Sequence, residues 1–361
     1  MKKNIHLMLL AGILLMTAQL PCEAKGKKEK EKTAESCLYL MATDYVKADG
    51  QTDVADAIQK LIDDNPNRTI YFPDGVYMIS HSILTPADPT KAVHLVLANF
   101  ATFKAMENWQ GGPLVRLGGE HPYNSITING SNYGIEGGIF DGSNIADGIS
   151  IDSGRETRVC HASIKHVKTG IYVMDGANYG SSDADIVDVN IVCNGDAESI
   201  GILIEGNDNT FSNMRISTCN TGVWCKSSGN SMKNIHPLSG AHYETSCGFR
   251  IEGTNNWFDY CYSDHFGTGF KLGRKSYNHF TFCWAYWYSE KVPFQVGIEC
   301  DGPLESYFEG LRFGFRGDNV TKTLLKAEKG GRGWIDCTRM PGCEFTPDDV
   351  SKEYTRQRCM E

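Results

Sequence analysis

A short pattern recurs along the chain: a glycine, an apolar residue, any residue, an apolar residue and any residue. The copies are GISID, GIYVM, GILIE, GVWCK, GFRIE, GFKLG and GIECD, which begin at Gly148, Gly170, Gly201, Gly222, Gly248, Gly269 and Gly297. Successive copies start 21 to 31 residues apart. A unit of this length with short strands and no helix cannot bury its own apolar face, whereas stacked units can. The repeat therefore predicts an all-β solenoid.

A second pattern lies eight or nine residues after most of these glycines. Its clearest copies are NTFSN, NSMKN, NWFDY and NHFTF, which begin at Asn209, Asn230, Asn256 and Asn278. Alignment with weaker copies gives two apolar columns: Val159, Ile186, Phe211, Met232, Phe258, Phe280 and Phe308, and then Ala162, Val189, Met214, Ile235, Cys261, Cys283 and Leu311. Because alternate residues of a strand share a face, both columns are expected to face one core.

The two patterns together predict a right-handed parallel β-helix that forms a single domain. Its coils are visible over residues 107–316, and residues 37–106 are expected to form the N-terminal cap and the first coils. The repeat fades from about Gly317, so residues 317–361 are expected to form a C-terminal cap. Asn213 and Asn234 fall at a bend of the repeat, where an Asn side chain can bond its own backbone.

The N-terminal cap is expected to contain a helix over residues 53–64, with Thr52 as its capping residue. Its apolar stripe consists of Val54, Ile58, Leu61 and Ile62. A helix at this place closes the open end of the stack, which otherwise presents unpaired strand edges.

The first residues have the layout of a secretory signal peptide. Lys2 and Lys3 precede an apolar run from Leu7 to Leu20, and Ala24 ends a cleavage motif, so residues 1–24 are predicted to be removed on export. The run is too short to span a bilayer. Residues 25–36 are charged and are expected to form a linker. Export predicts a location in the periplasm, at the cell surface or outside a bacterial cell.

Charge and cysteine spacing exclude two kinds of site. The formal net charge is −9 and the body has no block of Lys and Arg, so no nucleic-acid partner is expected. The cysteines show no paired metal-binding spacing, and no metal site is expected from them. An exported chain can form disulfides, and the C-terminal segment allows a Cys337–Cys343 or a Cys343–Cys359 pairing.

The segment DGQTDVADAIQKLIDDNPNRTIYFPDGVYMIS resembles the opening of the pectate-lyase-like superfamily. The matching positions are Asp49, Gly50, Asp53, Phe72, Pro73, Gly75 and Tyr77. The resemblance covers about residues 44–316 and implies the β-helix fold, with catalysis on the outer face of one strand column. It does not imply one activity, because polygalacturonases, rhamnogalacturonases, polysaccharide lyases, epimerases and phage tailspikes share this fold.

The catalytic residues of that superfamily have no match here. Arg250 and Ile251 keep the first two residues of the Arg-Ile-Lys motif of polygalacturonase-like members, but Glu252 replaces its lysine. The N-T-D, paired D-D and G-H-G motifs are absent from the coils that precede this one, and the W-I-D-H motif is absent too. A site must therefore be argued from the outward residues of this chain.

Those outward residues gather charges on successive coils. If the residues after each repeat glycine alternate between core and solvent, Glu205, Lys226 and Glu252 form an outward stripe. The residues expected beside it are Trp224, Arg250 and Lys271. The simplest interpretation is that these opposite charges only pair and keep the surface soluble.

Two catalytic interpretations remain open. In a glycosidase, Glu205 and Glu252 serve as acid and base, roughly 9–10 Å apart across two coils, near the upper edge of the inverting range. Lys226 between them then tunes their pKa values. In a lyase, Lys226, Lys271 or Arg250 removes the C5 proton of a uronate, and a neighbouring cation or a bound calcium ion neutralises the sugar carboxylate.

Loop and aromatic residues extend the candidate site. The connection 238–247 offers His242, a proton-transfer candidate, and Glu244. In NHFTFCWAYWYSE, Phe280 belongs to the core column, and the phase flips beyond the bend at Phe282. The residues expected to stack on a sugar are Tyr172, Trp224, Tyr262, Trp284 and Tyr286. Alternatively, the C-terminal tail folds over the last of these.

The function predicted from the sequence is cleavage of glycosidic bonds in a polysaccharide or oligosaccharide, by hydrolysis. The alternatives are a polysaccharide lyase and a non-catalytic glycan-binding or adhesive β-helix. No cofactor is expected, apart from calcium in the lyase case. A monomer and a homotrimer are both compatible with the sequence.

Overall fold

The computed structural model describes residues 39–119, 133–176, 181–339 and 349–356, all within one compact unit, residues 38–361. The predicted signal peptide and linker lie outside the described residues. So do Cys343 and Cys359, on which the two disulfide predictions depend.

One strand of each coil belongs to a sheet of ten described strands, in which every pairing is parallel. These strands are β5 (Ile83–Leu84), β7 (Pro113–Leu117), β9 (Asp147–Ile151), β12 (Thr169–Val173), β15 (Ile200–Ile204), β17 (Thr221–Cys225), β19 (Cys247–Ile251), β22 (Thr268–Leu272), β25 (Phe294–Pro303) and β27 (Thr321–Glu328). We call this the ten-stranded sheet. It contains all the glycine repeats named above.

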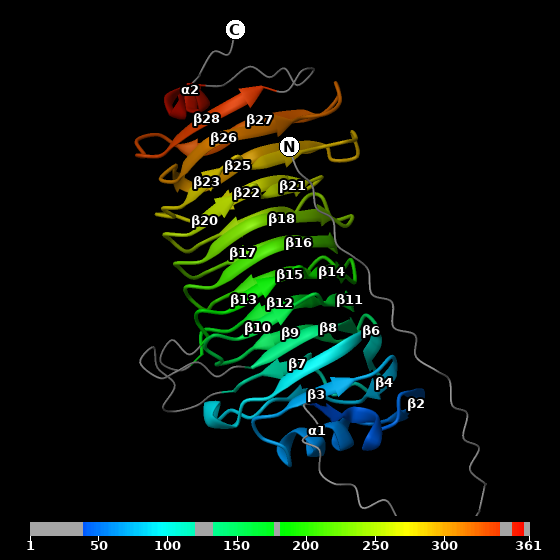
Figure 1. Ribbon diagram of the computed structural model, residues 1–361. Coiled ribbons are helices and arrows are strands. Elements are labelled where there is room, and N and C mark those ends of the chain that lie inside the picture. The colour runs from blue at the N-terminus through cyan, green and yellow to red at the C-terminus, as the bar shows by residue number, and fades with distance from the viewer. Residues whose placement is uncertain (1–38, 120–132, 177–180, 340–348, 357–361) are drawn as a thin grey trace, which may run out of the picture. The chain divides into compact units, whose positions relative to one another are not determined.

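The rest of each coil belongs to a larger parallel sheet. Its strands are β1 (Leu40–Met41), β2 (Asp49–Asp53), β3 (Thr69–Phe72), β4 (Gly75–Ile79), β6 (His94–Ala105), β8 (Gly134–Asp141), β10 (Arg158–Cys160), β11 (Ser163–Val167), β13 (Asp185–Val187), β14 (Asn190–Cys193), β16 (Thr210–Cys219), β18 (Ser231–Ser239), β20 (Trp257–Asp259), β21 (Tyr262–Asp264), β23 (His279–Thr281), β24 (Trp284–Tyr286), β26 (Tyr307–Gly314), β28 (Trp334–Arg339) and β29 (Thr355–Arg356). Figure 1 shows the coils stacked in chain order. The predicted parallel β-helix is confirmed.

In seven successive coils the larger sheet bends at a residue with left-handed backbone. These residues are His161, Asp188, Asn213, Asn234, Tyr260, Phe282 and Gly310, with φ between 51° and 64°. Asn and Asp tolerate this conformation better than other non-glycine residues. The predicted bend at Asn213 and Asn234 is thus observed, and the two amides bond each other at 3.1 Å rather than their own backbone.

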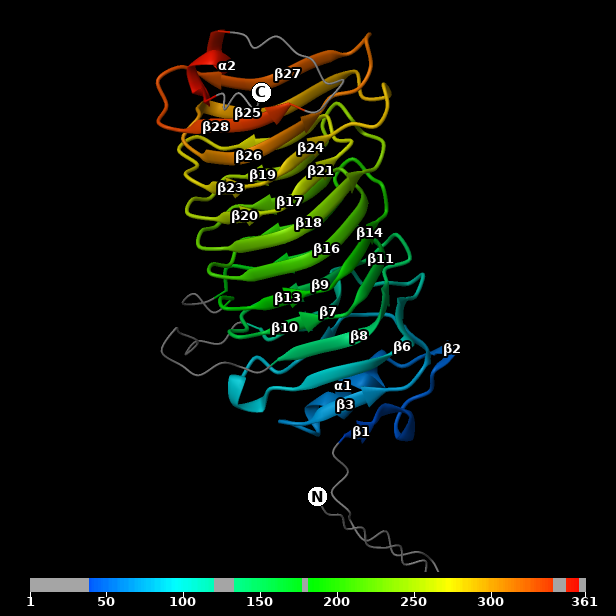
Figure 2. The same ribbon diagram turned by 45° about the horizontal axis from the view of Figure 1, so that its top comes forward.

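Both predicted apolar columns lie in the core, where every member is at most 1% exposed. Phe280 stacks between Phe258 and Phe308, with ring centroids 4.5 Å and 4.2 Å away. Figure 2 shows the strands of the larger sheet that supply these three rings, β20, β23 and β26. Stacked aromatic rings and aliphatic columns fill the space between the sheets without a helix.

A buried asparagine ladder lies at the turns after four successive glycine strands, β15, β17, β19 and β22. The Asn230 Oδ1 accepts from the backbone N–H of Asn209 at 3.0 Å, and the Asn256 Oδ1 accepts from that of Asn230 at 2.9 Å. Asn278 continues the ladder, and the Ser306 hydroxyl accepts from its N–H at 3.1 Å. Because buried backbone N–H groups need acceptors, this ladder explains why Asn recurs at that position.

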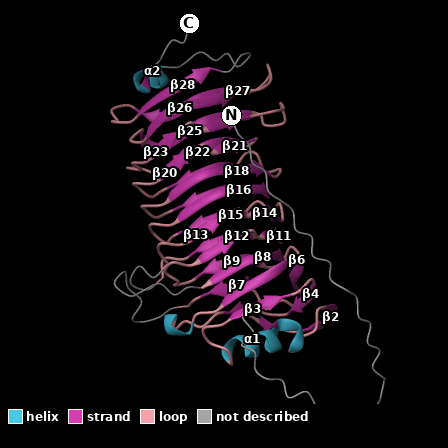
Figure 3. Cartoon of the chain, viewed as in Figure 1, coloured by secondary structure: helices cyan, strands magenta, loops and turns pink. Residues whose placement is uncertain are grey.

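Short helices lie at the two ends of the stack (Figure 3). They are α1 (Ala55–Asp63), α2 (Asp349–Tyr354) and two 3₁₀ turns (Ala42–Asp44 and Pro89–Lys91). The predicted apolar stripe of α1 is buried. The prediction that Thr52 caps it is wrong: Val54 is the N-cap, the Asp53 carboxylate accepts from the Ala55 N–H, and the Thr52 hydroxyl donates to Asp49 at 2.8 Å.

The β-helix also continues past Gly317. β27 pairs with β25, and β28 pairs with β26, so the segment expected to be a cap supplies another coil. β27 reads TKTLLKAE and lacks the repeat glycine, which is why its strand was not seen in the pattern. α2 follows, and Tyr354 is buried, with its hydroxyl donating to the Glu328 carbonyl at 2.7 Å.

Candidate functional site

The outer face of the ten-stranded sheet carries one continuous column of stacked side chains. Parallel pairing places them in register: Arg116, Ser150, Tyr172, Leu203, Trp224, Arg250, Lys271, Glu299 and Lys326. From Ser150 to Glu299 this is the order that the sequence predicts. Glu205, Lys226 and Glu252 directly follow β15, β17 and β19, so they lie beside the column at the strand ends.

Glu205 is the centre of the polar contacts on this face. The Lys226 Nζ donates to its Oε1 at 2.8 Å, and the Tyr172 hydroxyl donates to its Oε2. Burial opposes ionisation, but these two hydrogen bonds and the charge of Lys226 outweigh it, so the pKa of Glu205 lies below its ordinary value. Burial and the bond to Glu205 raise the pKa of Tyr172. At neutral pH the pair is therefore a carboxylate and a protonated phenol.

Trp224 lies under two cations. The Arg250 guanidinium is 3.9 Å from its ring centre and the Lys226 Nζ is 4.4 Å away. Arg250 also bonds Glu252, with its Nη2 2.7 Å from Oε1. A sugar can stack on Trp224 only if it displaces one of these cations or uses the exposed rim of the ring.

Lys271 belongs to the next pair along the column. Its Nζ donates to Glu299 at 3.1 Å, and Lys326 approaches the same carboxylate at 3.8 Å. Burial lowers the pKa of Lys271, but the hydrogen bond and charge of Glu299 outweigh it, and the net shift is upward. A raised pKa makes Lys271 a poor general base at neutral pH.

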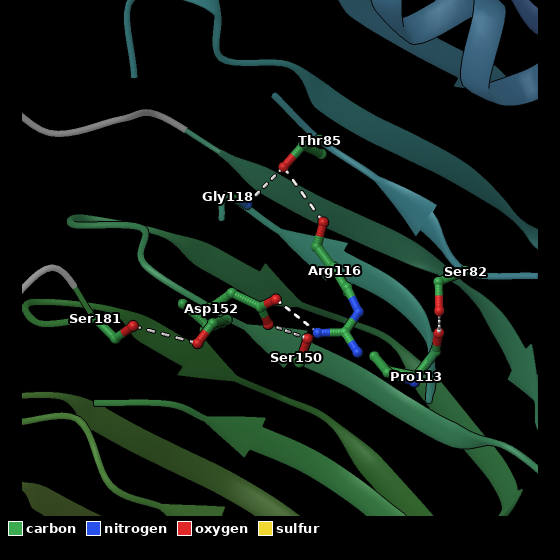
Figure 4. Close-up of polar contacts among 9 residues, drawn as sticks. Ser82, Thr85, Pro113, Arg116, Gly118, Ser150, Asp152 and Ser181 are labelled. Atoms are coloured by element: carbon green, nitrogen blue, oxygen red, sulfur yellow. Dashed lines mark hydrogen bonds and ion pairs between the residues drawn. The ribbon is translucent and has the colours of Figure 1, made fainter. Parts of the chain in front are cut away.

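A hollow of about 200 Å³ adjoins Tyr172 on the N-terminal side. It is lined by residues of β7, β9 and β12 and their flanks: Gly112, Pro113, Arg116, Asp147, Ile149, Ser150, Thr169, Tyr172 and Met174. The Arg116 Nη1 donates to Asp152 at 2.9 Å, and the Ser150 hydroxyl donates to the other oxygen of that carboxylate. Figure 4 shows Arg116 and Ser150 converging on Asp152.

The backbone around Arg116 is also held in place. The Thr85 N–H donates to the Arg116 carbonyl at 3.0 Å. The Thr85 hydroxyl accepts from the Gly118 N–H at 2.6 Å and donates to the same Arg116 carbonyl at 3.4 Å (Figure 4). The glycine repeat does not predict the position of Arg116, because β7 reads PLVRL and lacks the repeat glycine. The alternation of residues in PLVRL, compared with that in β9, is the sequence feature that indicates an outward Arg116.

His242 and Glu244 do not contact this face. The His242 Nε2 lies 3.1 Å from the Gly195 carbonyl oxygen, and Glu244 is exposed. Within the described ranges no hydrogen bond or ion pair joins either residue to Glu205 or Glu252. Their loop enters β19 at Cys247, and five residues of strand, about 16 Å, separate that end from Glu252.

The aromatic residues predicted to bind sugar lie on two different surfaces. Tyr172 and Trp224 belong to the ten-stranded sheet, while Tyr262, Trp284 and Tyr286 are on the outer side of β21 and β24 in the larger sheet. Tyr262 lies between the rings of His236, 3.5 Å away, and Trp284, 5.3 Å away. Burial raises the pKa of Tyr262 to about 12. These five residues therefore cannot form one binding site.

In the described part of the chain, no group of three or more His, Cys, Asp or Glu residues is placed to hold a metal ion. No helix among the described residues is both long and apolar enough to cross a membrane.

Comparison with known proteins assigns the family. Residues 42–250 match the family model described as rhamnogalacturonase A/epimerase, pectate lyase-like. The chain belongs to this family. The match runs from the first 3₁₀ turn through β18 and into β19, and it includes Arg116, Glu205 and Lys226. No curated protein matches the chain.

Solved structures show the same fold in other members of the β-helix class. Bacteriophage phi29 gene product 12 is 14% identical with a TM-score of 0.57, over 82% of this chain and 51% of its own. ORF18 of Geobacillus virus E2 is 16% identical with a TM-score of 0.55, and the match covers 84% of this chain and 62% of ORF18. The GH87 α-1,3-glucanase of Streptomyces thermodiastaticus is 14% identical with a TM-score of 0.53, over 84% and 63%. The chain thus spans less than two thirds of each of these structures.

Proposed function

We propose that this pectate-lyase-like family member is a carbohydrate-active enzyme that hydrolyses glycosidic bonds of a polysaccharide on the outer face of the ten-stranded sheet. One observation carries the proposal: the Glu205 carboxylate is held by Lys226 and by Tyr172, and Tyr172 lines a hollow that Arg116 borders. The family description names a rhamnogalacturonase, and that name supports a polysaccharide as the substrate class.

Glu205 acts as the base in this proposal. Its lowered pKa keeps it able to accept a proton from water at neutral and mildly acidic pH. The same property makes it unsuitable as the proton donor. Glu252 is the candidate donor, and two coils separate it from Glu205, roughly 9–10 Å at the ordinary strand spacing. That separation is near the upper edge of the inverting range, so we expect the product to have the inverted anomeric configuration.

The ion pair between Arg250 and Glu252 sets a condition on this mechanism. Arg250 bonds the carboxyl of Glu252, which must give a proton to the leaving oxygen in this mechanism. A sugar that stacks against Trp224 would have to move Arg250 away from Glu252. Substrate binding then frees Glu252 from this ion pair.

Lyase chemistry is the second candidate, and the cations support it. Arg116, Lys226 and Arg250 lie along one face, where they can neutralise the carboxylate of a uronate. Neutralisation lowers the cost of removing the C5 proton. The Tyr172–Glu205 hydrogen bond offers a route for that proton, from the phenol oxygen to the carboxylate.

A digest of acidic and neutral polysaccharides with the mature protein separates these functions. Reducing ends and the ultraviolet absorbance of unsaturated uronides are followed in the same samples. Hydrolysis is expected to release reducing ends without the ultraviolet signal, and Glu205→Gln is expected to abolish that release. Both signals together would establish a lyase, and neither signal on any substrate would favour a glycan-binding protein.

A further inference from the structure

A second aromatic column lies on the larger sheet, away from the candidate active site. Its members are Trp257 on β20, His279 on β23, Tyr307 on β26 and Trp334 on β28. They are paired in register from coil to coil. None of these four strands belongs to the ten-stranded sheet. We call this set the C-terminal aromatic column.

The rings of this column follow one another along the coil axis. His279 and Tyr307 have ring centres 5.3 Å apart, and Tyr307 and Trp334 have ring centres 6.0 Å apart. Trp257 is 51% exposed. Large aromatic rings on a solvated face are unusual unless they bind something, because each leaves a wide apolar area in water.

Polar side chains border the rings. The next outward positions of the same strands carry Asp259, Thr281 and Glu309, again in register. A hollow of about 260 Å³ lies between the two rows and is lined by His279, Phe280, Thr281, Tyr307, Glu309 and Trp334. No Lys or Arg is among these lining residues, whereas Arg116 lines the hollow of the ten-stranded sheet.

We propose that this hollow is a second glycan-binding site, which holds a neutral oligosaccharide segment along the coil axis. Rings accept the apolar C–H face of a pyranose, and an adjacent carboxylate, hydroxyl and imidazole accept and donate hydrogen bonds to its hydroxyl groups. A uronate chain is disfavoured, because its carboxylates would face Glu309, and no Lys or Arg lines the hollow.

The column also has a suitable repeat. Successive coils place one ring after another at the strand spacing, about 4.8 Å, which is close to the advance per sugar of an extended polysaccharide. Several rings in line therefore allow neighbouring sugars of one chain to be held together. The proposal does not depend on catalysis, because none of these residues belongs to the candidate active site.

Affinity electrophoresis of the mature protein tests the proposal, with neutral β-glucan, mannan, xylan and galactan in separate gels and polygalacturonate as the acidic contrast. The variants are Tyr307→Ala, Glu309→Gln and Trp257→Ala. Phe282→Ala is the matched control, since Phe282 is an exposed ring at the neighbouring bend, 48% exposed, and does not line the hollow. Unfolding curves and light scattering on each variant check folding and oligomeric state.

We expect at least one neutral polysaccharide to retard the wild-type protein, with an affinity reduced about tenfold in Tyr307→Ala and Glu309→Gln and unchanged in Phe282→Ala. Trp257→Ala, an exposed position, gives the same information if Tyr307→Ala does not fold. The proposal is overturned if no neutral polysaccharide retards the protein, if only polygalacturonate does, or if Phe282→Ala loses as much affinity as Tyr307→Ala. A change of oligomeric state in these variants would also overturn it, because the column would then be an interface between copies. Loss of hydrolysis in Glu205→Gln with retained retardation would separate the two sites.

Discussion

The outer faces of the two sheets differ although one repeat builds both. On the ten-stranded sheet the outward column and its flank contain several ion pairs, such as Lys226–Glu205, Arg250–Glu252 and Lys271–Glu299. On the larger sheet the C-terminal coils stack ring upon ring. In-register stacking places each side chain against its equivalent one coil away, so like charges need partners, while aromatic rings can repeat.

The two faces also differ in what they offer a sugar. The ten-stranded sheet presents the Glu205 carboxylate with two hydrogen-bond donors, and acid–base chemistry uses such groups. The C-terminal aromatic column presents ring faces beside a hydroxyl and a carboxylate, with no Lys or Arg lining its hollow, and these groups suit retention of a neutral sugar. The comparison suggests that one chain carries separate surfaces for reaction and for holding.

Replacement of the central carboxylate is the largest expected effect on the charged face. Glu205→Gln keeps the shape of the side chain but removes the base, so kcat/KM is expected to fall by about 10²–10⁴-fold. Initial rates on the best substrate of the polysaccharide panel measure this, with thermal unfolding as the folding check. Glu328→Gln is the matched control, because Glu328 is also ion-paired, with Arg274 at 3.3 Å, but lies outside the site. Full activity of Glu205→Gln would remove Glu205 from the mechanism.

The inside and outside of the aromatic region are expected to differ sharply in stability. Phe280→Ala opens a cavity between Phe258 and Phe308 and is expected to lower the free energy of unfolding by about 3–5 kcal/mol. Phe282→Ala, two residues further along, removes an exposed ring and is expected to change it by less than about 1 kcal/mol. Urea unfolding of both variants measures the difference. Similar losses in the two would mean that the outer rings are structural.

The interior beneath both faces depends on the asparagine ladder. In the wild type the Asn256 Oδ1 accepts from the Asn230 N–H at 2.9 Å, and the Asn256 Nδ2 donates to the Ser227 carbonyl at 3.0 Å. Asn256→Ala removes both bonds. Since unsatisfied buried groups are costly, we expect a loss of about 1–3 kcal/mol in the free energy of unfolding. Ser231→Ala, at the exposed start of β18, is the control and is expected to be nearly neutral. A neutral Asn256→Ala would show that water or a backbone shift replaces the ladder.

The smallest predicted effect is a shift in pH dependence. Lys226→Met removes a group that lowers the pKa of Glu205, so that pKa rises, and the acidic limb of kcat/KM is expected to move to higher pH. The pH dependence of stability should change as well. A carboxyl whose pKa is lowered by folding stabilises the folded state at pH values above its unfolded-state pKa, and this contribution is lost as the pH falls through its folded-state pKa. The free energies of unfolding of the variant and the wild type should therefore converge in acid.

Rates across the acidic range test this shift, and unfolding at several pH values tests the convergence. A limb that stays in place would mean that Tyr172 alone holds Glu205 in its ionised form. Complete loss of activity in Lys226→Met, with the fold intact, would instead favour Lys226 as a lyase base.

The sequence predicted the interior better than the exterior. The phase flip at Phe282, the buried columns and the order of the outward residues follow from period-two alternation and from burial, which the residues themselves encode. The repeat does not predict β27, because this strand lacks the repeat glycine. The side chain of Thr52 is of a type that caps helices, but its hydroxyl bonds Asp49 instead.

What the sequence by itself determined is the β-helix, its repeat and which side chains face outward, because stacking makes each of these a local property of one coil. Only the tertiary structure decided which outward residues meet. It brought Tyr172 to Glu205 from another coil and placed two cations on Trp224. It also set Arg116 beside the hollow and left His242 in the loop before β19, at the end of that strand opposite to Glu252. Side-chain contacts between coils depend on rotamers and on register across 20 to 30 residues, which alternation along one strand does not specify.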